Sequence, residues 1–124
     1  ETEQERDAGK TSAVVARQIT GSVPETSSAA DTVIAYEPVW AIGTGKTPSA
    51  DDVQDVHAMM RAKVAEILTP GEADRIRLLY GGSVKPSNAG ELMALSDVDG
   101  ALVGGASLNS EDFWAIAESC PAQP

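Results

Sequence analysis

The sequence predicts an α/β protein in which short parallel strands alternate with helices. Three observations lead to this prediction. Short apolar runs recur along the chain, each run is followed by a segment with helical spacing or a helix cap, and each run ends in a glycine pair or a carboxylate. Strands that alternate with helices form a parallel sheet through right-handed crossovers, so we expect the carboxyl ends of the strands to meet at one edge.

The first helix and strand follow a charged opening, residues 1–10, in which Gly9 is a helix breaker. Residues 11–19 predict a short helix with three apolar residues on one side, Val14, Val15 and Ile19. A loop rich in Ser, Thr and Pro covers residues 21–30, and residues 32–36 predict a buried strand.

The longest helix is predicted to begin after Ser49 and to end near Leu68. Ser49 and Asp52 have the spacing of a capping box, and acidic residues suit the positive end of the helix dipole. Its apolar face is formed by Val53, Val56, Met60, Val64 and Ile67. Pro70 and Gly71 are expected to close it.

Two more strands are predicted at residues 76–80 and 100–103, and a glycine pair follows each of them directly. Between them we expect a short helix capped by Ser87 and running through Leu95. A last helix, capped by Asn109 or Ser110, carries apolar residues on one side, Phe113, Ile116 and Ala117.

A carboxylate stands where the first predicted strand ends. Pro38 restricts Glu37 to an extended backbone, which gives the carboxylate a stiff mount. The apolar residues Trp40, Ala41 and Ile42 lie outside any regular element, where exposed apolar residues usually cover something. The segments 38–40 and 43–46 have the character of two hinges, which predicts a lid over the carboxylate. The alternative is a plain connecting loop whose Trp40 packs on a helix.

The glycine pairs predict an anion site at the same edge. Consecutive glycines let backbone N–H groups approach a ligand closely, so the segments 81–83 and 104–105 could share one phosphate. The alternative is that these glycines only supply a positive φ in tight turns. Glu37 is either a base near the phosphate or an acid paired with a nearby Arg or Lys.

Length, charge and cysteine content exclude several classes of protein. The 124 residues fit one domain, 1–124, and the net charge of -10 disfavours nucleic acid and anionic membranes as partners. Cys120 is the single cysteine, so no intrachain disulfide forms and a reducing compartment is expected. No apolar run approaches the roughly 20 residues of a membrane span, no signal peptide is expected, and a first residue other than Met suggests a fragment, a processed chain or an engineered one.

The remaining chemical groups favour structural roles. His57, the only histidine, flanks the apolar face of the long helix, so we expect it to be structural or at the solvent edge. Lys46 is expected to anchor the end of the lid and Lys85 to raise the local potential. Trp114 is interpreted as a packing residue and Cys120 as incidental.

Three stretches resemble triosephosphate isomerase: AYEPVWAIGTG at 35–45, LYGGSV at 79–84 and DGALVGGAS at 99–107. The opening residues resemble the segment just after that family's fifth strand, at Glu1, Thr2, Arg6, Gly9, Lys10 and Thr11. The resemblance covers nearly the whole chain. It implies the C-terminal part of a (β/α)8 barrel, from the helix after the fifth strand onward.

The resemblance also implies a reaction, with no cofactor and no metal. Glu37 would move a proton between the two carbons of dihydroxyacetone phosphate and glyceraldehyde 3-phosphate through an enediolate, in glycolysis and gluconeogenesis. Backbone N–H groups of Gly43, Ser83 and Gly105 would bind the phosphate, with Gly104 beside them. Tyr80 and Ser83 would hydrogen-bond the closed lid, which consists of Pro38, Val39, Trp40, Ala41, Ile42, Gly43, Thr44, Gly45, Lys46 and Thr47. A cytoplasmic homodimer is the family expectation.

The chain departs from the family at two catalytic positions. The family uses a lysine after its first strand and a histidine after its fourth, and no residue here matches either. We therefore keep a second interpretation, a non-catalytic half-barrel that binds phosphate or self-assembles. A three-stranded sheet would leave two bare edges and one uncovered apolar face, so we expect self-association or pairing with the N-terminal half of the barrel.

Overall fold

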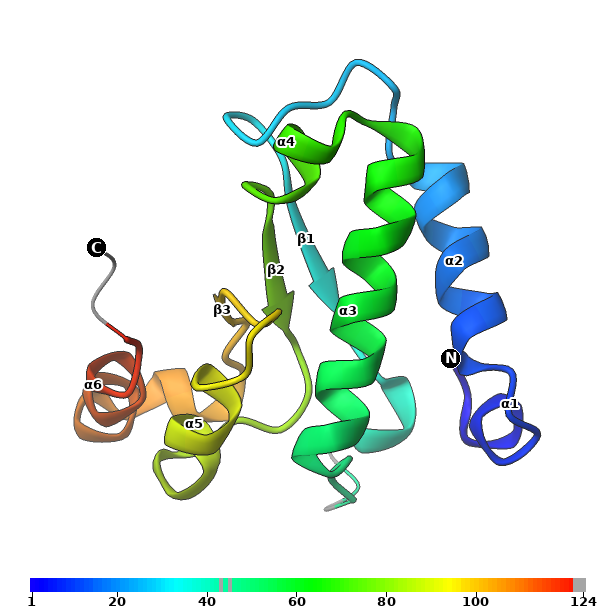
Figure 1. The fold of residues 1–124 in the computed structure, drawn as a ribbon. Coiled ribbons are helices and arrows are strands. Elements are labelled where there is room, and N and C mark those ends of the chain that lie inside the picture. Colours follow the sequence, from blue (N-terminus) through cyan, green and yellow to red (C-terminus); the bar gives the residue numbers. More distant parts are fainter. Residues whose placement is uncertain (43, 45, 122–124) are drawn as a thin grey trace.

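The computed structural model describes residues 1–42, 44 and 46–121, and its helices and strands alternate as predicted (Figure 1). In chain order the elements are α1 (Glu3–Asp7), α2 (Thr11–Ser22), β1 (Val33–Tyr36), the 3-10 helix η1 (Val39–Ala41), α3 (Ala50–Ile67), α4 (Pro70–Ala73), β2 (Arg77–Tyr80), α5 (Pro86–Met93), β3 (Gly100–Ala101), the 3-10 helix η2 (Gly105–Leu108) and α6 (Ser110–Glu118). None of the described helices combines the length and the apolarity that crossing a lipid bilayer requires.

The three strands form one parallel sheet in the order β1-β2-β3. Tyr36 pairs with Tyr80 at the carboxyl ends of β1 and β2. The third strand is shorter than the predicted range 100–103, because only Gly100 and Ala101 pair with β2 before the chain turns away. The parallel direction brings all three carboxyl ends to one edge of the sheet, as the alternation of elements requires.

The two faces of the sheet differ in burial. On the face that meets the helices, Tyr36 is 5% exposed and Leu78 and Tyr80 are 0% and 1% exposed. On the opposite face Val33 is 54% exposed, because successive residues of a strand point to opposite sides and no described element covers this side. The prediction of a buried strand at 32–36 is therefore correct for one face only, and the uncovered apolar face is present.

The helices α2 and α3 lie side by side on the covered face (Figure 1). The apolar stripe predicted for the long helix faces the core, and Val53, Met60 and Val64 are at most 1% exposed. Ser49 and Asp52 form the predicted capping box at the start of α3. The core continues through β2 into α5, where Leu92 is 5% exposed.

Several predicted helix boundaries were wrong for local reasons. The helix predicted at 11–19 continues to Ser22. Pro70 does not close α3 but begins α4, because the Thr69 hydroxyl accepts a hydrogen bond from the Glu72 N–H and proline suits the first helical position. The helix α5 begins one residue before the predicted cap Ser87, where the Asn88 side chain accepts from the Lys85 N–H at 2.8 Å.

Two features of the termini also differ from the prediction. The charged opening forms a helix, α1, with a capping box between Thr2 and Glu5 that was visible in the sequence. In α6, Asn109 is the cap as predicted, but Phe113 is 47% exposed and only Ile116 is buried. Trp114, which we expected to pack, is 65% exposed.

A polar network on α3 ties the helix to the β2 and β3 region. Arg61 donates to Asp97 at 2.7 Å and to Asp99 at 2.8 Å, and the Asp99 carboxylate also accepts from the Leu78 N–H at 2.8 Å. Burial opposes the charged form of Asp97, but the Arg61 and Gln54 hydrogen bonds outweigh it and lower the Asp97 pKa. The Arg61 guanidinium thus joins α3 to the segment before β3, and Asp99 of that segment joins it in turn to β2.

Candidate active site

The three features predicted to meet at the carboxyl edge of the sheet line one cleft. The cleft has a volume of about 810 Å³. Glu37 lies on one side, residues 81–85 follow β2, and residues 104–106 follow β3. The sheet topology thus brings together segments that are far apart in the sequence.

Glu37 is exposed at the end of β1, and Pro38 behind it is buried. The Gly81 N–H donates to the Tyr36 carbonyl at 2.7 Å, so the ladder between β1 and β2 continues up to the carboxylate. A Cβ atom on Gly81 would lie 2.5 Å from Cγ of Glu37. Gly81 is therefore needed for the close approach of the second turn to the carboxylate side chain.

The glycine turns act through close packing rather than through an unusual backbone. Among the described glycines only Gly9 has a positive φ, 68°, so the alternative explanation for Gly81, Gly82 and the pair 104–105 is wrong. Gly82 lies directly over Tyr80, since a Cβ atom there would be 2.1 Å from the Tyr80 hydroxyl oxygen. Burial raises the pKa of Tyr80 to about 12, so the phenol stays protonated near neutral pH.

Ser83 contacts the lid in this structure, and its hydrogen bond to a closed lid stays a prediction. The Ser83 hydroxyl donates to the carbonyl of Ala41 in the lid at 3.2 Å, and the Asn88 side chain donates to the Ser83 carbonyl at 3.0 Å. A contact between Tyr80 and the lid stays a prediction.

The turn after β3 opens to the cleft. A Cβ atom on Gly104 or on Gly105 would meet no other atom within 4 Å. Gly105 begins η2, and the first N–H groups of a helix have no partner within it. The predicted phosphate ligand Gly43 lies outside the described residues.

Hydrogen bonds within the lid join several of its described residues. Val39–Ala41 form η1, Ala41 is fully buried, and Ile42 is 47% exposed and lines the cleft. The Thr44 hydroxyl donates to the Trp40 carbonyl at 2.7 Å. Lys46, predicted to anchor the lid, pairs with Glu3 of α1, and the predicted lid residues Gly43 and Gly45 lie outside the described part.

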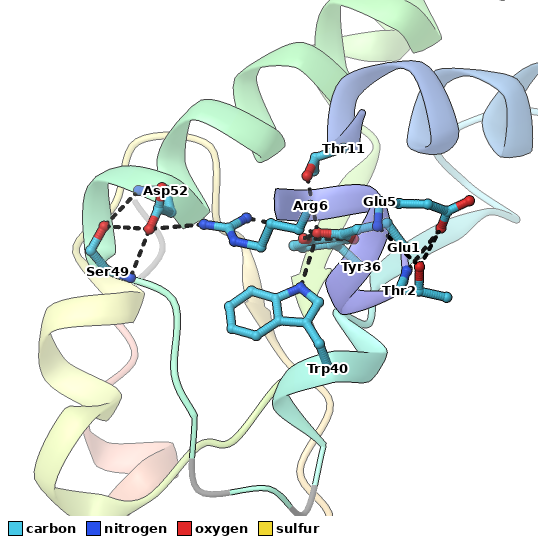
Figure 2. Close-up of polar contacts among 9 residues, drawn as sticks. All are labelled: Glu1, Thr2, Glu5, Arg6, Thr11, Tyr36, Trp40, Ser49 and Asp52. Atoms are coloured by element: carbon cyan, nitrogen blue, oxygen red, sulfur yellow. Dashed lines mark hydrogen bonds and ion pairs between the residues drawn. The ribbon is translucent and has the colours of Figure 1, made fainter. Parts of the chain in front are cut away.

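A buried carboxylate next to the lid was not predicted. The side chain of Glu1 is 0% exposed and accepts hydrogen bonds from the Tyr36 hydroxyl at 2.9 Å and from the Trp40 indole at 3.0 Å (Figure 2). Burial and the Glu1 carboxylate raise the pKa of Tyr36. Trp40 thus packs on the segment 1–7. Glu1 is separated from Tyr36 by 35 positions and from Trp40 by 39 positions, so no local sequence pattern could reveal these contacts.

The only histidine lies away from the cleft. His57 is 0% exposed beneath the sheet and its Nδ1 lies 3.1 Å from the Asp97 carbonyl, so the solvent-edge part of the expectation is wrong and the structural part is correct. Lys85 lines the cleft together with Asp112, and its effect on the local potential stays a prediction. Among the described residues no three His, Cys, Asp or Glu side chains are grouped as metal ligands would be.

The sheet and its edge define part of a (β/α)8 barrel with a carboxylate and two glycine turns at the carboxyl ends of the strands. The sequence matches the model of the family "Triosephosphate isomerase" over residues 1–120. The chain belongs to the triosephosphate isomerase family.

Individual relatives agree with this assignment. The chain is 60% identical over 121 residues to a triosephosphate isomerase of Rhodopseudomonas palustris (strain BisA53), which covers 98% of this chain and 47% of the relative. It is 58% identical over 123 residues to one from Xanthobacter autotrophicus, which covers 99% of this chain and 48% of the relative. The crystal structure of triosephosphate isomerase from Bartonella henselae superposes with a TM-score of 0.86 at 45% identity, over 96% of this chain and 46% of that one. The chain spans about half the length of the curated relatives it matches.

Proposed function

We propose that this chain supplies the base, the lid and the phosphate-binding turns of a triosephosphate isomerase. The observation that carries the proposal is that Glu37 and both glycine turns line one cleft. Family membership supports it, because relatives of 54% to 60% identity are named as this enzyme.

In the proposed reaction the Glu37 carboxylate removes a proton from the hydroxyl-bearing carbon next to the carbonyl of dihydroxyacetone phosphate. The electron pair of that C–H bond forms the carbon–carbon double bond of the enediolate, and the carbonyl electron pair moves onto oxygen. Glu37 then returns the proton to the former carbonyl carbon, and the hydroxyl proton passes from the first oxygen to the second, which gives glyceraldehyde 3-phosphate. The N–H groups of Ser83 and Gly105 hold the phosphate, with Gly104 beside them, and the lid 38–47 excludes water.

No histidine of this chain lies in the cleft to donate a hydrogen bond to the enediolate oxygen. His57, the one histidine of the sequence, is buried beneath the sheet. Removing one such preorganised donor costs about 2.7–4 kcal/mol, or roughly 10²–10³ in rate. This observation favours a second candidate function for the chain alone, phosphate binding without turnover. It also supports the proposal that full activity needs the strands that precede this segment in its relatives.

Two measurements on the purified chain test the proposal, after intact mass has verified its termini. The first is isomerisation of dihydroxyacetone phosphate, which Glu37→Gln is expected to abolish if any turnover is present. The second is calorimetric titration with a phosphorylated carboxylate that mimics the enediolate.

A side chain at Gly105 provides a matched test of the phosphate site. Gly105→Val is expected to weaken analogue binding at least tenfold, which corresponds to about 1.4 kcal/mol, because its side chain would stand where the phosphate binds. A Cβ atom at this position meets no atom within 4 Å beyond the neighbouring residues, and urea unfolding checks that the variant remains folded. Gly90→Ala on α5 is the control and is expected to bind like the parent. Equal analogue affinity in Gly105→Val and the parent would contradict the proposed site.

A further inference from the structure

One arginine contacts the lid near its start and the helix cap that follows the lid. The guanidinium carbon of Arg6 lies 4.6 Å from the centroid of the Trp40 ring, near the start of the lid (Figure 2). On its other side Arg6 pairs with Asp52 at 3.0 Å. Asp52 holds Ser49 in the capping box of α3, and Ser49 comes two residues after the lid ends.

Neighbouring groups hold the Arg6 side chain in place. Its side chain is 23% exposed and lies 3.7 Å from the buried Glu1 carboxylate, which also accepts the Trp40 indole hydrogen bond at 3.0 Å. A planar guanidinium can lie over the Trp40 ring and pair with a carboxylate at the same time, whereas a lysine ammonium is a single point charge.

The same short segment also contacts the lid near its other end. Glu3 of α1 pairs with Lys46, and both side chains are about half exposed, 51% and 56%. Because exposed ion pairs contribute little free energy, this contact is secondary to the half-buried contacts of Arg6.

We propose that Arg6 is a positioning residue of the lid, which fixes Trp40 and the capping box of α3 relative to each other. The inference rests on the proposed function in one respect, which is that residues 38–47 are taken as the lid of a site at Glu37. Loss of Arg6 frees the first half of the lid while the sheet edge beneath it stays intact.

The test follows the lid of the full 124-residue chain without substrate. The parent for these measurements carries Trp114→Phe, so that Trp40 is the only tryptophan. In Arg6→Met, acrylamide quenching of Trp40 and tryptic cleavage after Lys46 are both expected to rise roughly 5-fold, the factor that corresponds to a contact of about 1 kcal/mol. Cleavage is measured by the mass of the fragment that begins at Thr47.

Three further variants separate positioning from a general effect. Arg17→Met removes the same charge from an exposed position on α2 and is expected to leave both readouts unchanged. Asp52→Asn keeps the stack on Trp40, so only cleavage after Lys46 is expected to rise. Arg6→Lys keeps the charge but not the plane, so quenching of Trp40 is expected to rise while the far-UV circular dichroism stays the same.

Specific results would overturn the proposal. If Arg6→Met folds and its Trp40 quenching and its cleavage after Lys46 equal those of Arg17→Met, the proposal is overturned. If Arg6→Met does not fold, Arg6→Lys decides, and quenching equal to the parent overturns the proposal. Titration of the same proteins with the analogue separates the two proposals. If the parent does not bind the analogue but the variants give the expected quenching and cleavage, the result contradicts the proposed function and leaves the role of Arg6 supported.

Discussion

A Cβ atom on Gly82 would lie 2.1 Å from the hydroxyl oxygen of Tyr80, which is 1% exposed and cannot swing into solvent. We therefore expect Gly82→Ala to destabilise the fold by about 1–3 kcal/mol through overpacking. Urea unfolding followed by circular dichroism measures the change.

The control for this prediction is Gly90→Ala in α5, where a Cβ atom meets nothing within 4 Å. Alanine is a better helix former than glycine, so this variant is expected to gain about 0.5–1 kcal/mol. Equal stability of Gly82→Ala and the parent would show that the turn after β2 can move away from Tyr80.

The Arg61 network predicts a second stability difference. Arg61→Met removes the donor shared by Asp97 and Asp99, whose carboxylates lie at 2.7 and 2.8 Å, so we expect a loss of about 1–3 kcal/mol. Arg75→Met is the matched control, since Arg75 is 68% exposed and its pair with Glu72 should contribute less than about 1 kcal/mol. Similar unfolding midpoints for the two variants would contradict the role of Arg61.

The buried histidine predicts a dependence of stability on pH. Burial lowers the pKa of His57 below 6.5, and this effect outweighs the Asp97 carbonyl and the nearby Asp99 carboxylate, which raise it, while Arg61 lowers it further. The unfolded chain therefore binds a proton more readily than the folded one, and stability falls as the pH drops below 6.5 towards the folded pKa.

The slope in this window is at most about 1.4 kcal/mol per pH unit for one group. His57→Asn keeps a donor for the Asp97 carbonyl but does not titrate. Urea unfolding between pH 7.5 and pH 5 is expected to show a smaller slope for His57→Asn than for the parent. Parallel curves would mean that His57 does not contribute to the pH dependence.

The uncovered face of the sheet predicts association of the isolated chain. Val33 is 54% exposed and Leu102 is 45% exposed, and strand edges beside such residues pair readily with other chains. Val33→Asp combined with Leu102→Asp is expected to weaken self-association roughly tenfold, which corresponds to about 1.4 kcal/mol. Sedimentation velocity over a range of concentrations measures this, with Ala62→Asp on the exposed side of α3 as control. A parent that stays monomeric and unfolds cooperatively would contradict the prediction.

Local sequence patterns determined the order of elements, the cap at Ser49 and the register of the α3 stripe, and they narrowed the cap of α6 to Asn109 or Ser110. These features depend on residues within one or two helical turns, so spacing alone reveals them. The alternation of strands and helices was also sufficient to predict that Glu37 and both glycine turns would share one edge, because parallel strands leave no other arrangement.

Only the tertiary structure decided which partners these residues meet. The burial of Glu1 against Tyr36 and Trp40, the position of Arg6 between Trp40 and Asp52, and the packing of Gly82 on Tyr80 all depend on how elements approach in space. The exposure of Val33 and Phe113 follows the same logic, since an apolar residue is buried only where another element covers it. Local periodicity determines which side of an element is apolar, whereas the packing of distant segments decides whether that side is covered.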